Sequence, residues 1–150
     1  AETPDADFPL VLCTVREVGH YSCRSMTGNC AALQSLADEP GRVQINPADA
    51  DERGIAEGQL VWVRSRRGKV ITRASISERI NAGAIYMTYQ WWIGACNELT
   101  QDNLDPISRT PETKYCAVQL EAIEDQRWAE DFAASAYQTM KTRLIAAVNV

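Results

Sequence analysis

This sequence of 150 residues has few of the residues and motifs on which complex enzymes depend. It contains one histidine, His20, and no Cys-x-x-Cys pair, so a single short domain has few groups for complex chemistry. Its 15 Lys and Arg residues are outnumbered by 20 Asp and Glu residues, and the net charge of -5 argues against a general nucleic-acid binder. No apolar stretch approaches the ~20 residues that span a membrane.

The familiar phosphate-binding and metal-binding motifs are also absent. There is no Gly-x-Gly-x-x-Gly run and no Gly-Lys-Ser/Thr loop, so a nucleotide would need a different kind of site. The cysteines are odd in number and irregularly spaced, which argues against a disulfide framework and a structural zinc site. They are Cys13, Cys23, Cys30, Cys96 and Cys116. The simplest interpretation is a cytoplasmic protein with reduced, mostly buried thiols.

What is present is the composition of one globular domain. The chain is 45% hydrophobic and 23% charged, and at this length folding removes roughly 70% of the unfolded surface from water. Residues 1–7 are acidic and lack the apolar region of a signal peptide, so we expect a flexible N-terminal segment there. Residues 8–150 are expected to form the domain.

The order of apolar and polar residues predicts about six strands, at 8–15, 43–45, 59–65, 69–77, 84–89 and 115–123. Asn46 and Pro47 are typical of the cap and first position of a brief helix, and another short helix is expected after Thr27. Short strands separated by Gly and Pro turns favour a small closed barrel. The predicted fold is therefore mainly β with short helices.

The end of the chain has a helical pattern. Apolar residues recur there at i, i+4 spacing and predict one stripe on an amphipathic C-terminal helix. The stripe consists of Trp128, Phe132, Ala136, Met140 and Leu144. We interpret it as a packing surface and not as a cofactor site.

Positive charge is concentrated in one part of the chain. Between residues 61 and 80, six cations face the single carboxylate of Glu78; they are Arg64, Arg66, Arg67, Lys69, Arg73 and Arg79. Two interpretations of this predicted hairpin stay open. It is either a solvated face or a docking surface for an acidic partner or another domain.

A polar cluster follows the first predicted strand. Arg16, Glu17, His20 and Ser22 place a cation, a carboxylate, an imidazole and a hydroxyl within seven residues. Polar groups in a loop at a strand end are a common binding arrangement, because the scaffold holds the loop rigid. Arg16 offers a planar fork of donors for phosphate. We favour ligand binding for the set; His20 alone is equally typical of a structural histidine, and a catalytic triad is not supported.

Aromatic residues crowd a second strand end, at Tyr86, Tyr89, Trp91 and Trp92, with Gln90 among them. The rings could form the wall of a flat ligand's site while Gln90 recognises the ligand's edge. The alternative is core packing with one exposed tryptophan. Asn97 and Lys114 are isolated polar residues in predicted loops.

Three segments together resemble a known family. Residues 14–29 (TVREVGHYSCRSMTGN) and residues 86–99 (YMTYQWWIGACNEL) are similar to the C-terminal domain of molybdopterin-dependent formate dehydrogenases. Residues 45–63 are similar to the broader molybdopterin dinucleotide-binding domain. The resemblance covers nearly the whole chain from Phe8 onward, and the first and third segments make it specific.

This resemblance implies a double-psi β-barrel that covers a bis-molybdopterin guanine dinucleotide in an oxidoreductase converting formate to carbon dioxide. The cofactor-binding positions carried over from it are Thr14, Arg16, Glu17, His20, Ser22, Tyr89, Asn97 and Lys114. Thr113 stands where an aromatic residue is expected in close relatives. The resemblance places the metal-ligating residue, the catalytic residues and the iron–sulfur cysteines in earlier domains, with molybdenum or tungsten held by the cofactor. The expected partners are the other domains of the same parent chain.

The alternative hypothesis is a non-enzymatic adaptor or peptide-binding module. Double-psi barrels also serve as adaptor or peptide-binding domains, and a fold alone does not determine function. The basic hairpin would then be the docking face. The cluster from Arg16 to Ser22 favours the cofactor-binding hypothesis, since a peptide-binding module has no need for it.

Overall fold

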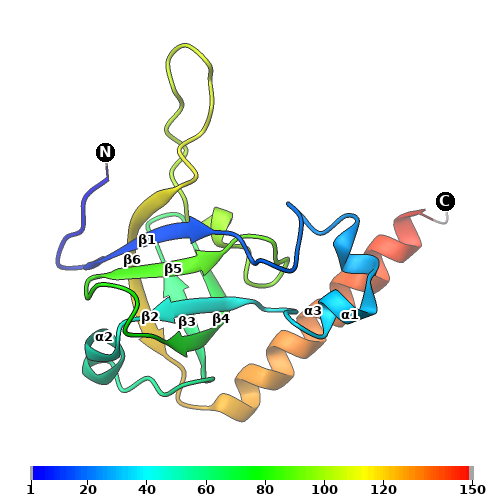
Figure 1. Ribbon diagram of the computed structural model, residues 1–150, viewed down its shortest axis with the longest axis horizontal. Helices are drawn as coiled ribbons and strands as arrows, with labels where there is room; N and C mark the ends of the chain where they lie inside the picture. The colour runs from blue at the N-terminus through cyan, green and yellow to red at the C-terminus, as the bar shows by residue number, and fades with distance from the viewer. Residues whose placement is uncertain (1, 149–150) are drawn as a thin grey trace.

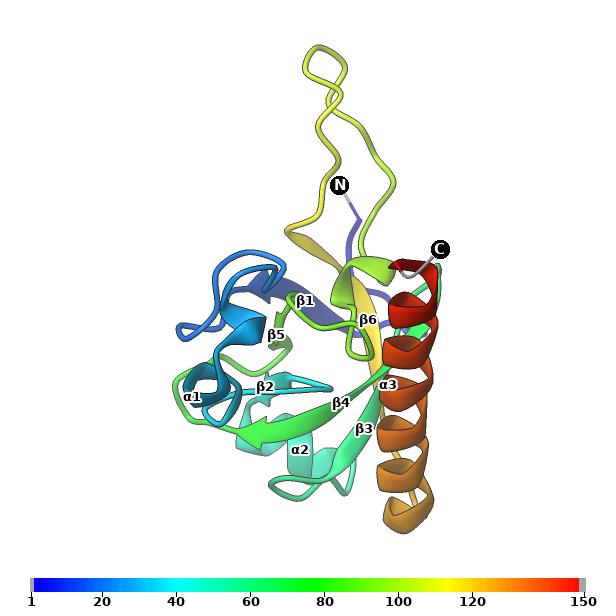
Figure 2. The same ribbon diagram turned by 90° about the vertical axis from the view of Figure 1, so that its right-hand side faces the viewer.

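A computed structural model of the chain describes residues 2–148, which form a closed six-stranded barrel with a long helix against one side (Figures 1 and 2). The strands follow the order β1-β5-β2-β4-β3-β6 around the barrel. They are β1 (Leu10–Val15), β2 (Arg42–Ile45), β3 (Leu60–Arg64), β4 (Lys69–Ile76), β5 (Ala84–Thr88) and β6 (Tyr115–Ala122). The predicted mainly β, closed-barrel fold is confirmed.

The helices are short except for the last one. They are η1 (Thr27–Asn29), α1 (Ala31–Gln34), α2 (Pro47–Glu52), η2 (Cys96–Glu98) and α3 (Gln126–Val148). The predicted start of α2 is confirmed, because Asn46 accepts a hydrogen bond from the Ala48 N–H at 2.9 Å and Pro47 is the first helical residue. None of the helices in residues 2–148 has the length and apolar character needed to span a bilayer.

Two of the strand pairings are parallel and join segments far apart in the chain. β1 pairs in parallel with β5, and β2 pairs in parallel with β4, while the other four pairings are antiparallel. β2 consequently lies between β4 and β5, and Gln44 is the register partner of both Ser75 and Tyr86. Alternate residues of the strands point inward and form the barrel core, as Leu10 and Leu12 of β1 show.

The helix α3 packs on the barrel through a face beside the predicted stripe, and two members of the stripe, Trp128 and Phe132, also contact Trp62 of β3, with ring centroids 6.4 and 5.9 Å apart. Ala129 and Ala133 are buried against β3 and β4, whereas Trp128, Phe132 and Leu144 are 47%, 39% and 47% exposed. Small alanine side chains let the helix approach the sheet closely, so the bulky rings lie beside this contact and not inside it. Trp128 and Phe132 stack on each other with ring centroids 5.2 Å apart.

Most cations of the basic run are neutralised within the described chain. Ion pairs join Arg64 to Glu121, Arg66 to Glu2 and Asp5, Arg67 to Glu2, and Arg73 to Glu130, while Lys69 lies over the ring of Trp62. Hydrogen bonding to Arg73 lowers the pKa of the Glu130 carboxyl. These pairs favour the solvated-face interpretation of the hairpin over the docking interpretation. Arg79 is the one arginine of the run that is absent from these pairs.

The N-terminal residues, which the sequence predicts to be flexible, contact the barrel. The carboxylate of Glu2 receives hydrogen bonds from Arg66 and Arg67 and from the backbone N–H of Ala117 in β6, the last at 3.0 Å. The Glu2 side chain is only 13% exposed. Residues of this segment thus join the β3–β4 turn to β6.

An exposed arm projects from the barrel between η2 and β6, as both ribbon views show (Figures 1 and 2). Its two sides meet at a bridge between Leu104 and Pro111. Near its tip, Asp105 accepts hydrogen bonds from the backbone N–H groups of Ser108 and Ile107, and these lower the pKa of its carboxyl. Ile107 is 92% exposed.

The five cysteines are all free but not equally accessible. Cys96 and Cys116 are buried and Cys13 is half-buried, whereas Cys23 and Cys30 are exposed, so the predicted burial holds only for part of the set. Burial raises the pKa of the Cys96 thiol to about 12 and that of Cys116 to about 11. Hydrogen bonds from Ser25, first from its backbone and then from its side chain, lower the pKa of Cys23.

These differences predict an order of thiol reactivity. In the native protein at pH 8, iodoacetamide should alkylate Cys23 first, because its thiol is exposed and its pKa is below the ordinary value of 9.0. Cys96 and Cys116 should stay unmodified, since roughly one molecule in a thousand or fewer carries either thiolate at that pH. Peptide mass spectrometry over a time course measures the order. Alkylation of Cys96 as fast as Cys23 would contradict it, and a urea-unfolded sample provides the control.

Candidate functional site

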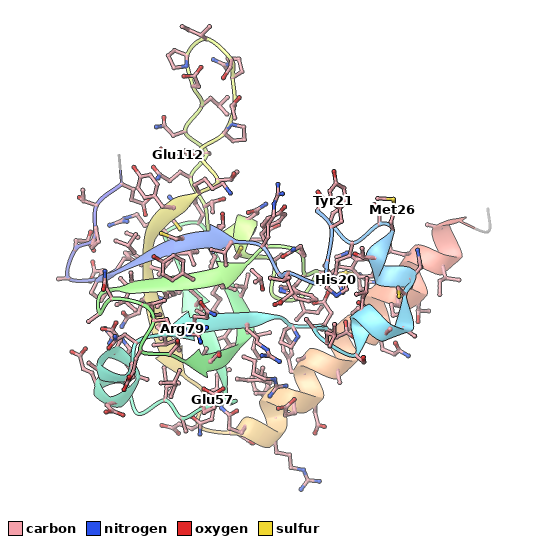
Figure 3. All side chains as sticks on the ribbon, in the orientation of Figure 1. His20, Tyr21, Met26, Glu57, Arg79 and Glu112 are labelled. Carbon is pink, nitrogen blue, oxygen red and sulfur yellow. The ribbon has the colours of Figure 1, made fainter. Side chains whose placement is uncertain are left out.

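A groove of about 450 Å³ lies on the outer face of the barrel, across β1, β5, β2 and β4. The loop after β1 contributes Arg16 and Glu17 to it, and β2 contributes Arg42 and Gln44. Arg79, from the loop after β4, completes the charged lining. In Figure 3 the Arg79 side chain lies over the barrel face near β2.

Neutral groups cover the floor of the groove. Ser75, Gln44 and Tyr86 lie side by side there, since they are register partners on β4, β2 and β5. Thr88, at the end of β5, extends this floor toward β1. The floor therefore offers hydroxyl and amide groups together with one aromatic ring.

The charge of the groove is strongly unbalanced. Among residues 2–148, Arg16, Arg42 and Arg79 form no ion pair with any carboxylate. The Glu17 carboxylate, the acidic group of the lining, accepts only a local hydrogen bond from the Val18 N–H at 3.3 Å. Three cations against one carboxylate suit an anionic ligand.

Two of the eight predicted site residues, Arg16 and Glu17, line this groove. Thr14 precedes them on β1 and is buried, where its hydroxyl donates to the Thr113 carbonyl at 2.8 Å. The Thr14 N–H donates to the Lys114 carbonyl at 2.9 Å, while Lys114 itself is exposed. Thr14 and Lys114 therefore come together where β1 meets β6.

His20 lies inside the loop and not in the groove. It is 5% exposed, and its ring nitrogens are within 3.0 Å of the Thr27 hydroxyl and 2.9 Å of the Ala37 carbonyl. The carbonyl can only accept, so Nε2 carries the proton and donates to it. No ring nitrogen is left for a ligand in this arrangement, and Figure 3 shows His20 on the inner side while Tyr21 points outward.

The remaining predicted residues lie elsewhere. Ser22 is half-exposed further along the same loop, with a left-handed backbone (φ 46°). Tyr89 is half-buried against the core, and its N–H donates to the Val15 carbonyl at 3.3 Å. Asn97 is exposed in η2. The structure thus gathers only part of the predicted set around the groove.

Sequence reasoning missed Arg42, Gln44 and Ser75 and counted Arg79 only in the basic run, whereas Tyr86, which it named as a wall for a flat ligand, does line the groove. The alternation in β2 exposes Arg42 and Gln44 on one face, which is a usable local signal. Their neighbours on β4 and β5 are set by long-range pairing, which leaves no local pattern in the sequence.

Gln90 fixes the loop that carries Arg16 and Glu17. Its side chain is buried, and its Oε1 accepts a hydrogen bond from the Glu17 N–H at 3.0 Å. Its Nε2 donates to the carbonyls of Glu17 and His20, each at 3.4 Å. The suggestion that Gln90 recognises a ligand's edge is therefore wrong, because the loop backbone occupies its amide group.

A buried ion pair anchors the other end of this loop. The guanidinium of Arg24 is 5% exposed, pairs with the equally buried Glu39 carboxylate, and donates through Nε to the Gln90 carbonyl at 2.8 Å. Glu39 also accepts from the backbone N–H groups of Trp92 and Ile93, at 2.8 and 2.9 Å. Charge-assisted hydrogen bonds thus satisfy both ions.

Trp91 fills the space beneath this pair. Its ring lies 4.5 Å from the Arg24 guanidinium and meets His20 edge-on at 5.7 Å. Gly41 lies against the ring so closely that an added Cβ would be 1.9 Å from the indole nitrogen. Trp91 is 3% exposed and Trp92 is 41% exposed, which agrees with the alternative of core packing plus one exposed tryptophan.

Comparison with known proteins identifies the domain. Residues 10–117 match the family model described as "Molydopterin dinucleotide binding domain". The chain belongs to this molybdopterin dinucleotide-binding family. The match confirms the predicted family, and with the formate dehydrogenase relatives it supports the predicted molybdopterin guanine dinucleotide cofactor.

Relatives of this molybdopterin-binding domain include larger enzymes. Formate dehydrogenase H of Escherichia coli (strain K12) is 67% identical over 138 residues, which are 92% of this chain and 19% of that protein. F420-dependent formate dehydrogenase 2 subunit alpha of Methanococcus maripaludis is 40% identical over 122 residues, 81% of this chain and 18% of that subunit. The chain therefore spans about a fifth of the length of these relatives.

A solved structure supports the fold. Acetylene hydratase from Pelobacter acetylenicus aligns with a TM-score of 0.65 and 19% identity over 77% of this chain and 18% of that one. At this identity the likeness concerns the fold alone.

The residues of the groove fit the chemistry of a molybdopterin dinucleotide. Such a ligand has a diphosphate, polar pterin edges and flat rings. The arginines of the groove suit the diphosphate, and the Glu17 carboxylate suits the polar edge of the pterin. The Tyr86 ring suits a flat ring system. Within residues 2–148 no group of three or more His, Cys, Asp or Glu side chains could hold a metal ion.

The Arg24–Glu39 pair generates a stability prediction. Arg24→Met should lower the free energy of unfolding by about 3 kcal/mol, because it leaves the buried Glu39 carboxylate without its cation. Arg64→Met is the matched control, since the Arg64–Glu121 pair is 42% and 37% exposed and should contribute less than about 1 kcal/mol. Urea denaturation followed by tryptophan fluorescence measures both. Equal losses of unfolding free energy in the two variants would show that the buried pair contributes no more to stability than the exposed pair.

Proposed function

We propose that this chain is the domain of a formate dehydrogenase that closes over a bis-molybdopterin guanine dinucleotide, within an oxidoreductase that converts formate to carbon dioxide. The observation that carries the proposal is the groove in which Arg16 and Glu17 form no ion pair with any residue from 2 to 148. The likeness to two formate dehydrogenases supports the reaction. Because the chain spans about a fifth of those proteins, the remaining domains of the parent chain are its partners.

In this proposal the chain binds and orients the cofactor and takes no direct part in the reaction. The Arg16 guanidinium donates to phosphate or pterin oxygens, and the Glu17 carboxylate accepts from pterin N–H groups. Ser22, Tyr89, Asn97 and Lys114 are exposed or half-buried and lie outside the groove, so they are available only to parts of the cofactor that extend beyond it. When bound, the cofactor supplies the dithiolene ligands of molybdenum or tungsten and the path for electrons.

Thr14 and His20 act through the loop in this proposal. Both side chains are buried and hydrogen-bonded within the protein, so they hold the polypeptide on either side of Arg16 and Glu17. A binding residue must be held in place by groups that do not themselves touch the ligand. Their contribution to cofactor binding is accordingly the position of the loop.

We also infer that the barrel is of the double-psi class. Its support is the closed six-stranded barrel with two parallel pairs, β1–β5 and β2–β4, each of which requires a crossover in the chain. A cytoplasmic location is proposed as well. The five free cysteines support it, because disulfides are rare in reducing compartments.

Substitution of Arg16 tests the proposed function in the full-length parent enzyme. Arg16→Ala should reduce bound molybdopterin dinucleotide about tenfold or more when the enzyme is purified, because it removes a charge-assisted hydrogen bond. Formate-dependent dye reduction should fall in parallel. Cofactor content by mass spectrometry of the extracted pterin, and activity per enzyme, are the measurements.

Arg127→Ala is the matched control, because Arg127 is exposed on α3 and is not part of the groove. It should keep full cofactor content and activity. Unchanged cofactor content and turnover in Arg16→Ala would refute the assignment of this groove to the cofactor.

A further inference from the structure

The second half of α3 is almost entirely exposed. The helix is about 35 Å long at 1.5 Å per residue, and the buried side chains of its described part, Ala129 and Ala133, lie in its first half. Of residues 138–147 only Met140 is half-buried, and the others are exposed. Figure 1 shows this half extending past the ends of the strands. The short helices η1 and α1 overlap it in that view and lie apart from it in Figure 2.

The face of α3 that packs on the barrel continues into this exposed half. An α-helix turns by about 100° per residue, so Ala129, Ala133, Met140, Leu144 and Ala147 lie within about 60° of one another around the axis. The first two are buried against β3 and β4. The last three, which we call the terminal face, are apolar as well, yet Leu144 is 47% exposed. The apolar face of the helix is therefore longer than the barrel that covers it.

A helix end of this kind needs a partner to be stable. Residues 138–147 are fewer than the ~12–15 that an isolated helix needs to be even marginally stable in water. Most of the stability of protein helices comes from packing an apolar face, and the terminal face has no such packing among residues 2–148 beyond the half-buried Met140. The segment nevertheless contains no Gly or Pro and consists largely of good helix formers. This combination is typical of a helix that completes its packing on another surface.

Positive charges lie on both sides of the terminal face. Lys141 and Arg143 are each roughly 80° from its centre, in opposite directions around the axis. No Asp or Glu follows Asp131 in the chain. Neither cation forms an ion pair with any residue from 2 to 148; Lys141 lies over the ring of Tyr137 on the same helix, 5.3 Å from its centroid. An apolar face between two cations complements a surface that is apolar in the middle and acidic at its edges.

We propose that the terminal face of α3 docks on another domain of the parent chain, against an apolar surface with carboxylates on either side. The inference rests on the proposed function, and it names the part of this chain that holds the neighbouring domain. The chain spans about a fifth of its formate dehydrogenase relatives, so about four-fifths of such a protein is available as the partner. Because the terminal face continues the barrel contact of α3, one helix joins the barrel to its neighbour.

Hydrogen exchange followed by mass spectrometry tests the contact in two proteins, the full-length parent enzyme and the 150-residue chain. In the 150-residue chain, the amides of residues 138–147 should exchange almost as fast as in the urea-unfolded chain. In the parent enzyme they should exchange at least about a hundredfold more slowly, because docking buries the terminal face. The amides around Ala133 should be protected in both proteins and serve as the internal reference.

Substitutions in the parent enzyme test which face docks. Leu144→Gln should reduce the protection of residues 138–147 at least about tenfold, because it places an amide in an apolar contact. Thr142→Gln is the matched control, since Thr142 is exposed on the opposite face of the same turn, and it should leave the protection unchanged. Arg143→Glu should reduce the protection about fivefold by facing the acidic edge with a carboxylate. The same variants of the 150-residue chain correct for any effect on the helix alone, and their thermal unfolding should match that of the wild type.

The outcomes separate this inference from the proposed function. Equally fast exchange of residues 138–147 in both proteins, or equal losses in Leu144→Gln and Thr142→Gln, would overturn the docking face. If the 150-residue chain sediments as a dimer that Leu144→Gln dissociates, the occupant is a second copy and the proposal is wrong. Loss of cofactor in the Arg16→Ala enzyme would still support the proposed function in each of these cases. Conversely, a protected helix end in an Arg16→Ala enzyme that keeps its cofactor refutes the groove assignment and leaves the docking face intact.

Discussion

The buried ion pair between Arg24 and Glu39 is the constraint on which the candidate site depends. It joins three segments that are distant in sequence: the loop after β1, the turn before β2 and the stretch after β5. Ions are expensive to bury, and this pair is tolerated because both members have additional hydrogen bonds and the Trp91 ring covers them. The polar loop consequently has one position relative to the barrel.

The Arg24–Glu39 pair holds the loop rigid, and this rigidity decides which side chains of the loop line the groove. Gln90 binds the backbone of Glu17 and His20, so the side chains of Arg16 and Glu17 leave the barrel from fixed points. The internal polar groups of the region, including both nitrogens of His20, are occupied by neighbouring atoms. The side chains of Arg16 and Glu17 face the groove and remain available to a ligand, whereas Gln90 and His20 hold the loop.

Local patterns predicted the parts of the fold whose partners are close in sequence. The β3–β4 hairpin and the Asn46 cap were predictable because a strand alternation or a cap involves neighbours along the chain. The face that α3 presents to the barrel was not, because alanines at 129 and 133 permit a close approach that hydrophobicity alone does not reveal. The groove was only partly predictable, because some of its residues are neighbours along the chain and others become neighbours only in the folded barrel. Arg16 and Glu17 form a local cluster, whereas Gln44 and Tyr86 become neighbours only when β2 inserts between β4 and β5.

The contacts of Glu2 have a practical consequence for producing this domain. One carboxylate near the N-terminus satisfies two arginines of the β3–β4 turn and a backbone N–H of β6. A shortened version beginning at residue 8 would expose those two arginines and leave the Ala117 N–H without its acceptor. The β3–β4 turn and β6 would lose the contacts through which Glu2 joins them. A trimmed domain would then carry extra positive charge on a surface that is neutral in the longer chain, and it would bind anions there that have nothing to do with the groove.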